Sequence, residues 1–247
     1  MKLTIVGSGD AFGSGGRSNT CFWLQTAKAT LVVDFGASAL PALKARKLDP
    51  NAIDAVVLSH LHGDHFGGLP FLLLDYQFLA RRERPLLIAG PPGTQARLAA
   101  AMEVFFPKVS GTNWRFPWRV EEIAVGVETN VLGHALLTAE VLHQSGAPST
   151  ALRLSDGEKI FAYSGDTEWT DALKPISAQA DLFICECYAY VGKLTGHISW
   201  EILKPKIPEL RAKRIMLTHM NPSVLARLDE VRAAGLLVAE DGLIVEF

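Results

Sequence analysis

The segment His60-Leu61-His62-Gly63-Asp64-His65 constrains the fold and chemistry of this chain more than any other stretch. It gathers three of the seven histidines and an aspartate within six positions, directly after the apolar run AVVLS. Imidazoles and carboxylates are the ligands that zinc, manganese and iron accept. Four such side chains this close together cannot enclose one ion in a closed tetrahedron, whereas two neighbouring ions can divide them. We therefore predict a metal centre that takes further ligands from elsewhere in the chain.

Three more metal-type residues lie where strand-like runs end: His143 in EVLHQSG, Asp166 in YSGDT and His219 in MLTHMNP. A single histidine or aspartate at a strand end is more often a hydrogen-bonded structural residue. Ligand sites nevertheless gather at strand ends in sheets covered by helices, so these residues fit the first motif in combination. The predicted ligands are His60, His62 and His143 at one site, Asp64, His65 and His219 at the other, and Asp166 with a water or hydroxide bridging the two.

The distribution of apolar runs predicts alternating strands and helices with a β-rich middle over residues 118–163. The strand-like runs cover residues 3–6, 30–35, 55–59, 85–90, 159–165, 181–186 and 214–219. Helix-like stretches cover residues 37–47, 69–83, 94–106, 198–207 and 222–235. This pattern indicates α/β layers with mixed sheets.

The composition restricts the class of protein. The chain has 247 residues, 49% of them hydrophobic, and a formal net charge of −2. It therefore lacks the strongly basic body that grips long nucleic acid. No run approaches the ~18 apolar residues of a membrane span, and the first apolar run breaks at glycines before signal-peptide length. Three cysteines favour a reducing compartment over a disulfide framework, so we expect a soluble cytoplasmic protein.

Three other features have structural interpretations. Cys185 and Cys187 are two apart in a strand-like run, so both point to one face, which we interpret as core instead of a metal site. The basic segment ARRER, residues 80–84, is interpreted as a solvated helix end. The glycine-rich segment at residues 7–16 matches neither a dinucleotide fingerprint nor a P-loop, and we expect it to pass close to the metal centre.

The motif HxHxDH followed in order by a His, an Asp and a last His resembles the metallo-β-lactamase superfamily. The resemblance implies one domain over residues 1–247, folded as a four-layer αββα sandwich with two mixed β-sheets and a dinuclear site at one edge of both. Within the superfamily, the chain is similar to the ribonuclease Z-like branch, which includes small phosphodiesterases. The similar stretches are IVGSGDAF, PLLIAGPPGT, SGDT, DLFICEC, GHIS and LTHMNP.

Two departures from that branch bear on the substrate. The chain lacks the Gly/Pro-rich arm with which long-form ribonuclease Z grips transfer RNA. Where that family reads His-Glu-Ala-Thr, this chain reads Cys185-Glu186-Cys187-Tyr188, which keeps only the glutamate. These departures argue against transfer-RNA processing and leave phosphodiester chemistry open.

A phosphodiesterase must also protonate the alkoxide that leaves. His197, between Gly196 and a predicted helix start, is the candidate general acid; the alternative is a structural loop residue. The resemblance implies that Glu186 accepts a hydrogen bond from the other nitrogen of this ring. Asp64 is expected to orient the nucleophile as well as bind metal.

These residues lead to a hypothesis about the reaction. Two divalent ions, zinc or manganese, with two aspartates and a hydroxide would keep about one net positive charge, which suits an anionic substrate. We predict a dinuclear metal-dependent hydrolase that acts on a small phosphodiester, such as a cyclic nucleotide, through a metal-bridging hydroxide. Relatives of this type are often homodimers, although the sequence reveals no interface. The alternatives are a hydrolase of a lactone, thioester or β-lactam, and a metal-binding scaffold without turnover.

Overall fold

The computed structural model describes residues Met1–Phe247 and contains two seven-stranded mixed sheets. The first has the strand order β14-β1-β2-β3-β4-β5-β6 and the second β13-β12-β11-β10-β9-β8-β7. The strands of the first sheet are β1 (Lys2–Gly7), β2 (Cys21–Gln25), β3 (Thr30–Val33), β4 (Ala55–Val57), β5 (Leu86–Gly90), β6 (Trp118–Glu122) and β14 (Ile244–Glu246). Those of the second are β7 (Thr129–Val131), β8 (His134–Glu140), β9 (Thr150–Ser155), β10 (Ile160–Tyr163), β11 (Leu182–Glu186), β12 (Ile215–Thr218) and β13 (Leu237–Val238).

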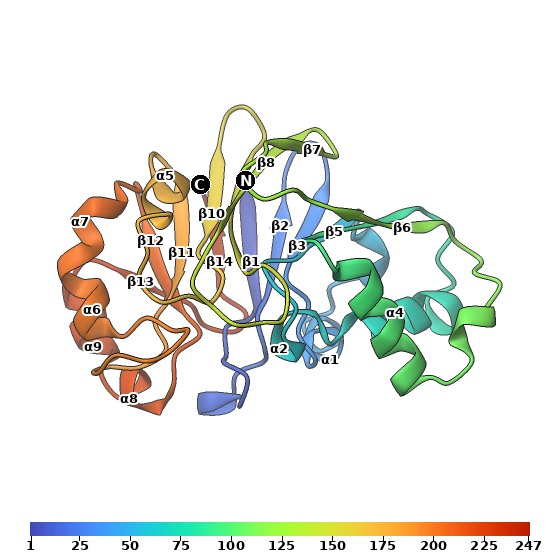
Figure 1. Cartoon of the computed structure of the whole chain (residues 1–247), viewed down its shortest axis with the longest axis horizontal. Coiled ribbons are helices and arrows are strands. Elements are labelled where there is room, and N and C mark those ends of the chain that lie inside the picture. The colour runs from blue at the N-terminus through green and yellow to red at the C-terminus, as the bar shows by residue number, and fades with distance from the viewer.

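Helices cover the outer face of each sheet (Figure 1). On the first sheet lie α1 (Ala39–Ala45), α2 (Gly63–Phe66), α3 (Leu69–Leu74) with a π-helical extension to Leu79, and α4 (Thr94–Phe105). On the second lie α5 (Leu173–Ser177), α6 (Trp200–Leu203), α7 (Ile207–Leu210), α8 (Pro222–Leu225) and α9 (Leu228–Ala233). The predicted four-layer αββα sandwich is confirmed. No helix combines the length and apolar character that crossing a membrane requires.

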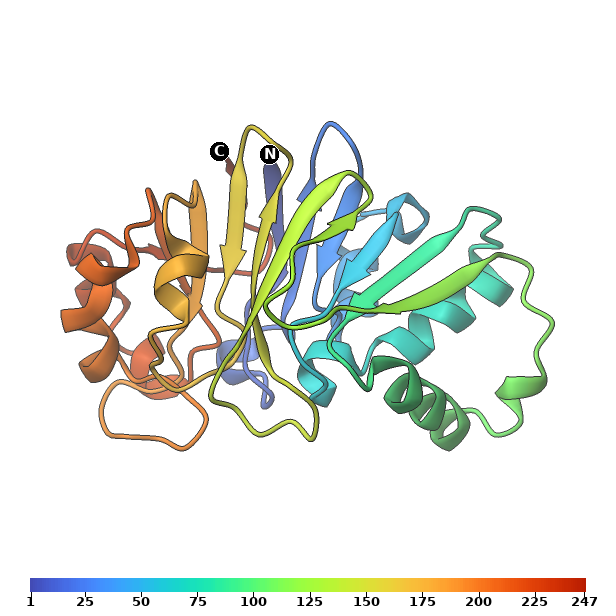
Figure 2. The same ribbon diagram turned by 45° about the horizontal axis from the view of Figure 1, so that its top comes forward.

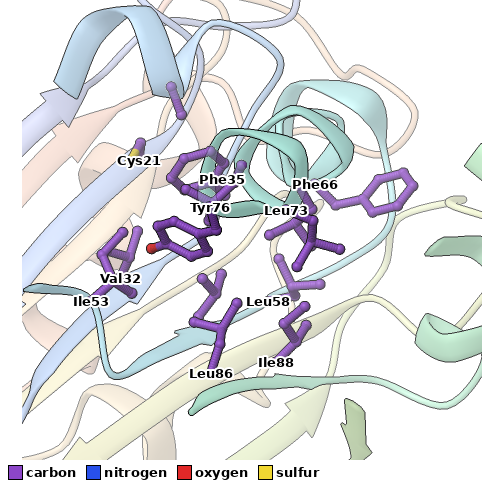
Figure 3. Close-up of a cluster of buried hydrophobic side chains, with 14 of the residues drawn as sticks. Cys21, Val32, Phe35, Ile53, Leu58, Phe66, Leu73, Tyr76, Leu86 and Ile88 are labelled. Carbon is purple, nitrogen blue, oxygen red and sulfur yellow. The ribbon is translucent and has the colours of Figure 1, made fainter. Parts of the chain in front are cut away.

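Three buried hydrophobic clusters hold the four layers together. They form because successive side chains of each strand point to opposite faces of the sheet. On β2, Phe22 and Leu24 face the second sheet, whereas Cys21 and Trp23 face the helices of the first. Figure 3 shows the helix-side cluster of the first sheet, where Tyr76 packs among strand side chains. Each large apolar side chain buried in this way contributes about 1.5–3 kcal/mol. Because both faces of the strands are covered, the strands read as nearly continuous apolar runs.

The two neighbouring cysteines belong to the third cluster, between the second sheet and its helices. Cys185 and Cys187 are fully buried there and form no disulfide. Their side chains alternate with Glu186, which ends β11 on the opposite face. The interpretation of these cysteines as core residues is confirmed.

The basic segment, residues 80–84, follows a helix end and exposes Arg81, Glu83 and Arg84, but Arg82 is buried. The helical turn stops at Leu79, and Arg82 is only 2% exposed. Its guanidinium donates to four carbonyl oxygens, those of Asn51, Ile53, Arg84 and Pro85. The interpretation from sequence was wrong for Arg82, because the fork of guanidinium donors satisfies loop carbonyls that have no strand partner.

Each of the seven predicted strand runs contains a strand, and the middle of the chain is β-rich as expected. Strands β2, β13 and β14 were not predicted. The helix predicted over residues 198–207 divides into α6, a 3-10 turn and α7, since Pro205 and Pro208 interrupt the backbone hydrogen bonds. The stretch at residues 222–235 likewise forms the separate helices α8 and α9.

The sheet topology brings many loops to one edge. Strands β3, β4 and β5 are parallel, as are β10, β11 and β12, so the carboxyl ends of each set point the same way. The loop after β1, helix α2 and helix α8 lie together at the lower edge of the molecule in Figure 1, and the termini lie near the opposite edge. Figure 2 shows the long loops after β8 and β11 at this same edge. The predicted site residues are therefore expected there.

Candidate metal centre

The HxHxDH segment forms the turn between β4 and α2. Its first histidine, His60, is fully buried, and His62 occupies the N-cap position of α2. Asp64 lies in the first turn of this four-residue helix, where backbone N–H groups favour a carboxylate. Because this short segment contains both a strand end and a helix start, its ligand side chains can point in two different directions.

The structure brings the seven predicted metal ligands together in two groups. In each group the potential ligand atoms lie within 4.8 Å of one another. One group contains His60, His62 and His143, and the other contains Asp64, His65, Asp166 and His219. This grouping matches the division expected from the sequence; the role of each residue as a ligand remains a prediction.

Asp166 lies between the two groups. Its Oδ2 atom is 3.2 Å from Nε2 of His65 and 3.3 Å from Nε2 of His219. The same oxygen is 3.8 Å from Nε2 of His60 and 4.0 Å from Nε2 of His143. A carboxylate in this position can contact ions in both groups, as expected of a bridging ligand.

The unsatisfied polar atoms of the centre test whether metal ions fit it. The Nε2 atoms of His60 and His65 and the Oδ1 atom of Asp166 are buried without any hydrogen-bond partner. Burying such atoms unpaired costs about 1–3 kcal/mol each, and metal coordination removes that cost. Imidazole and carboxylate groups without thiolates suit zinc or manganese. The residues present therefore fit a pair of divalent ions.

Electrostatics favour the metal-binding form at His60, His143 and Asp64, whereas at His65 and His219 burial lowers the pKa but the neighbouring carboxylates raise it overall. Burial lowers the pKa of His60 well below its usual value and also lowers the pKa of His143. Burial alone would raise the pKa of Asp64, but the adjacent His65 and the hydrogen bond from His219 lower it. Neutral imidazoles and ionised carboxylates are the metal-binding forms.

Hydrogen bonds to the far side of the rings orient two of the histidines. Nδ1 of His65 donates to Oδ2 of Asp34 at 2.7 Å, which leaves Nε2 for the centre. Asp34 also accepts bonds from the backbone N–H and the hydroxyl of Ser59, each at 2.7 Å. Nδ1 of His143 donates to the Gly196 carbonyl at 2.8 Å. Such outer partners fix ring orientation in metal sites.

Asp34 was missed by the sequence reasoning. It directly follows β3 in TLVVD, so it carried the same signal as Asp166, a carboxylate at the end of a buried strand. Both Asp34 and His219 have φ near 58°, a left-handed conformation that is uncommon among residues other than glycine. The sharp turns at these strand ends aim both side chains at the centre.

The glycine-rich segment passes close to the centre, as expected. The Ser8 carbonyl accepts a 3.1 Å hydrogen bond from the backbone N–H of His219 and a 3.3 Å bond from the Thr218 hydroxyl. The loop after β1 in the first sheet thereby fixes the end of β12 in the second. These contacts connect the two sheets at the edge that holds the metal centre.

The predicted acid–base pair also forms beside the centre. Nδ1 of His197 lies 3.0 Å from Oε1 of the buried Glu186. Burial disfavours the charged ring, yet the Glu186 hydrogen bond and charge raise the pKa of His197 to about 9. The ring stacks on that of Tyr188 and on that of His219, with centroid distances of 4.8 and 5.6 Å. A ligand-type atom of His197 lies within 4.8 Å of those of His143 and Asp166. The pair can therefore hold a proton next to the cluster.

Known proteins resemble the chain along nearly its whole length. The family model described as Anti-Pycsar protein Apyc1 matches residues 1–241. Ribonuclease Z of Bacillus licheniformis is 26% identical over 294 aligned positions, which cover 94% of this chain and 94% of that protein. These matches confirm the resemblance to the ribonuclease Z-like branch.

Solved structures show the same fold. The metallo-beta-lactamase fold protein YhfI from Bacillus subtilis superimposes with a TM-score of 0.79 at 22% identity, over 99% of each chain. Zinc-bound PqqB from Methylobacterium extorquens gives a TM-score of 0.79 at 18% identity, over 100% of each chain. The two sheets and their helices thus form the metallo-β-lactamase fold.

Proposed function

The chain belongs to the family of the anti-Pycsar protein Apyc1 and is a metal-dependent hydrolase of the metallo-β-lactamase fold, and from this premise we propose that it is a dinuclear phosphodiesterase. Its proposed substrate is a small phosphodiester, with a cyclic nucleotide as the first candidate. The observation that carries the proposal is the pair His197–Glu186, which places a proton donor beside the metal cluster.

The proposed metal ligands are the seven residues of the cluster, with Asp166 shared by both ions. When bound, two divalent ions would activate water for attack at neutral pH and polarise the phosphoryl group. Zinc suits this nitrogen and oxygen donor set, and PqqB of the same fold binds zinc. We propose zinc as the resident metal and manganese as the alternative.

The chain's own residues would orient the attack and complete the proton transfer. Asp64 accepts a hydrogen bond from the attacking water and aligns it with the phosphorus. As the new P–O bond forms and the bond to the leaving oxygen breaks, His197 donates its proton to that oxygen. Glu186 stabilises the charged imidazolium before the transfer and sets which ring nitrogen faces the substrate. A general acid of this kind contributes roughly 10²–10⁴-fold to the rate.

Two features support a small substrate. The chain lacks an RNA-gripping arm, and its net charge of −2 provides no extended basic surface. Membership of the Apyc1 family agrees with a cyclic nucleotide. A phosphodiester also needs the proton donor that the structure contains, because an alkoxide is a poor leaving group, whereas a thioester expels a thiolate that leaves without one.

The proposal is tested with purified protein loaded with zinc or manganese. We expect turnover of bis-p-nitrophenyl phosphate and of adenosine 3′,5′-cyclic monophosphate, and loss of both after chelation. A panel containing a lactone, a thioester and a β-lactam is assayed in parallel. Clear turnover of a member of that panel without turnover of either diester would reject the phosphodiesterase proposal.

A further inference from the structure

A cavity of about 290 Å³ adjoins the metal cluster on the side of His143. Residues 141–144, Glu168, Thr195 and Gly196 line it. Its volume is near the lower limit of small-molecule sites, ~300 Å³, and suits one sugar or base. His143 belongs both to the cavity wall and to the metal cluster, so the cavity lies directly beside the cluster.

Glu168 is the acidic residue of this cavity, and the backbone holds it in place. Its Oε1 atom accepts a 3.1 Å hydrogen bond from the Gly196 N–H, and its own backbone N–H donates to the Leu142 carbonyl at 3.0 Å. Gly196 has φ near +81°, and a Cβ atom there would lie 2.9 Å from Nδ1 of His143. The half-buried carboxylate thus has a fixed position, and its second oxygen has no protein partner.

The chemistry of a fixed carboxylate restricts what the cavity accepts. An ionised carboxylate accepts hydrogen bonds and donates none. Next to an anionic diester it is unfavourable unless the substrate offers an O–H or N–H donor, and it repels a second anionic group. A carboxylate in this position therefore interacts favourably with hydrogen-bond donors on the organic group of the substrate and unfavourably with its phosphate.

We infer that Glu168 is a specificity-determining residue that accepts a hydrogen bond from a donor on the organic group of the diester, either a ribose hydroxyl or a nucleobase amino group. This inference rests on the proposed phosphodiesterase function. The second carboxylate oxygen of Glu168 accepts the hydrogen bond from this donor, while Oε1 keeps its hydrogen bond from the Gly196 N–H. The same charge disfavours substrates that carry an additional phosphate on that group.

The test compares kcat/KM values as ratios, so that effects common to all substrates cancel. The substrates are adenosine 3′,5′-cyclic monophosphate, its 2′-deoxy analogue and its inosine analogue, in which a carbonyl replaces the amino group. We expect the wild-type protein to favour the adenosine compound about 10-fold over the analogue that lacks the contacted donor, as for a hydrogen bond to a charged group. Glu168→Gln retains an acceptor for Gly196 and should bring that ratio close to one. Glu158→Gln, in the exposed β9–β10 turn, is the matched control that keeps the ratio.

The outcomes separate this inference from the function on which it rests. If the wild-type kcat/KM is reduced only for the deoxy analogue, the ribose hydroxyl is the donor. If it is reduced only for the inosine analogue, the amino group is the donor. Equal rates for all three nucleotides, with turnover of bis-p-nitrophenyl phosphate, would overturn the role of Glu168 and leave the phosphodiesterase intact. No turnover of any diester would overturn both. Equilibrium dialysis of the same nucleotides against chelator-treated protein provides a readout without turnover, and the order of affinities should follow the order of rates.

Discussion

Two regions supply the metal cluster in different ways. The loop between β4 and α2 contributes His60, His62, Asp64 and His65 from one contiguous segment of the first sheet. The second sheet contributes three ligands, one from the loop that follows each of β8, β10 and β12: His143, Asp166 and His219. The first set, which we call the contiguous region, is positioned by one strand end and one helix start. The second set, the dispersed region, is brought together only because strands that run in the same direction end at the same edge of the sheet. The difference shows that a local motif can position some ligands of a site, while the sheet topology positions the others.

The dispersed region also contains the contact that unites the two groups, since Asp166 lies near histidines of both. The contiguous region contains Asp64, whose contacts are with His65 and His219 of one group. The comparison therefore predicts unequal consequences when an aspartate is replaced in one region or the other.

The largest effect is expected for Asp166→Asn. Losing the shared carboxylate should reduce bound metal to less than one ion per chain and lower kcat/KM on a diester by roughly 10³-fold, because activation of water and polarisation of the substrate depend on both ions. Asp64→Asn should lower activity but retain one ion. Metal content by plasma mass spectrometry and steady-state kinetics measure both. Asp171→Asn, on an exposed aspartate, is the control; two ions retained by Asp166→Asn would contradict the bridging role.

His197→Ala is expected to have the next largest effect, and the effect should depend on the leaving group. The rate on a cyclic nucleotide should fall by about 10²–10³-fold, since its alkoxide needs a proton. Turnover of bis-p-nitrophenyl phosphate should change much less, because p-nitrophenolate leaves without one. Glu186 raises the pKa of His197, so the acid form is present below that pKa and is lost as the pH rises through it. The alkaline decrease of the wild-type rate should therefore be absent in the variant; equal losses on both substrates would argue for a structural role.

Asp34→Asn tests how the contiguous region is supported. Replacing the carboxylate that orients His65 should weaken metal binding by roughly 10–100-fold. Competition with a chromogenic chelator measures the affinity. Ser59→Ala, which removes one of the hydrogen bonds to Asp34, should have a smaller effect in the same direction. An unchanged affinity in Asp34→Asn would show that α2 alone positions His65.

The smallest effect on the centre is expected for Cys185→Ala. Cys185 is a metal-type residue adjacent to Glu186, but it faces the helices of the second sheet. The variant should keep the metal content of the wild type and lose about 1 kcal/mol of stability through the small cavity created. Urea titration measures the stability, and loss of metal would contradict the assignment of this residue to the core.

Residues near the centre differ in how far they could be predicted. The HxHxDH segment was recognisable because four metal-type side chains in six positions have no packing explanation. His143, Asp166 and His219 were predicted through their positions at strand ends. Asp34 carried the same strand-end signal but was missed, and it contacts His65 only because β3 and β4 are adjacent and parallel. Away from the centre, the burial of Arg82 was not predicted, because nothing local reveals the four carbonyl oxygens that surround it.

The sequence was sufficient to predict α/β layers with mixed sheets and the chemical type of the centre, and the resemblance to the metallo-β-lactamase superfamily implied the four-layer arrangement. Apolar runs and the identity of the ligands are local properties that can be recognised without coordinates. Coordinates were needed to show that Asp34 supports His65, which ring nitrogens remain free, and where Glu168 lies relative to His143. These depend on distances between residues far apart in the chain, and such distances are set by strand order, parallel register and the packing of one sheet on the other.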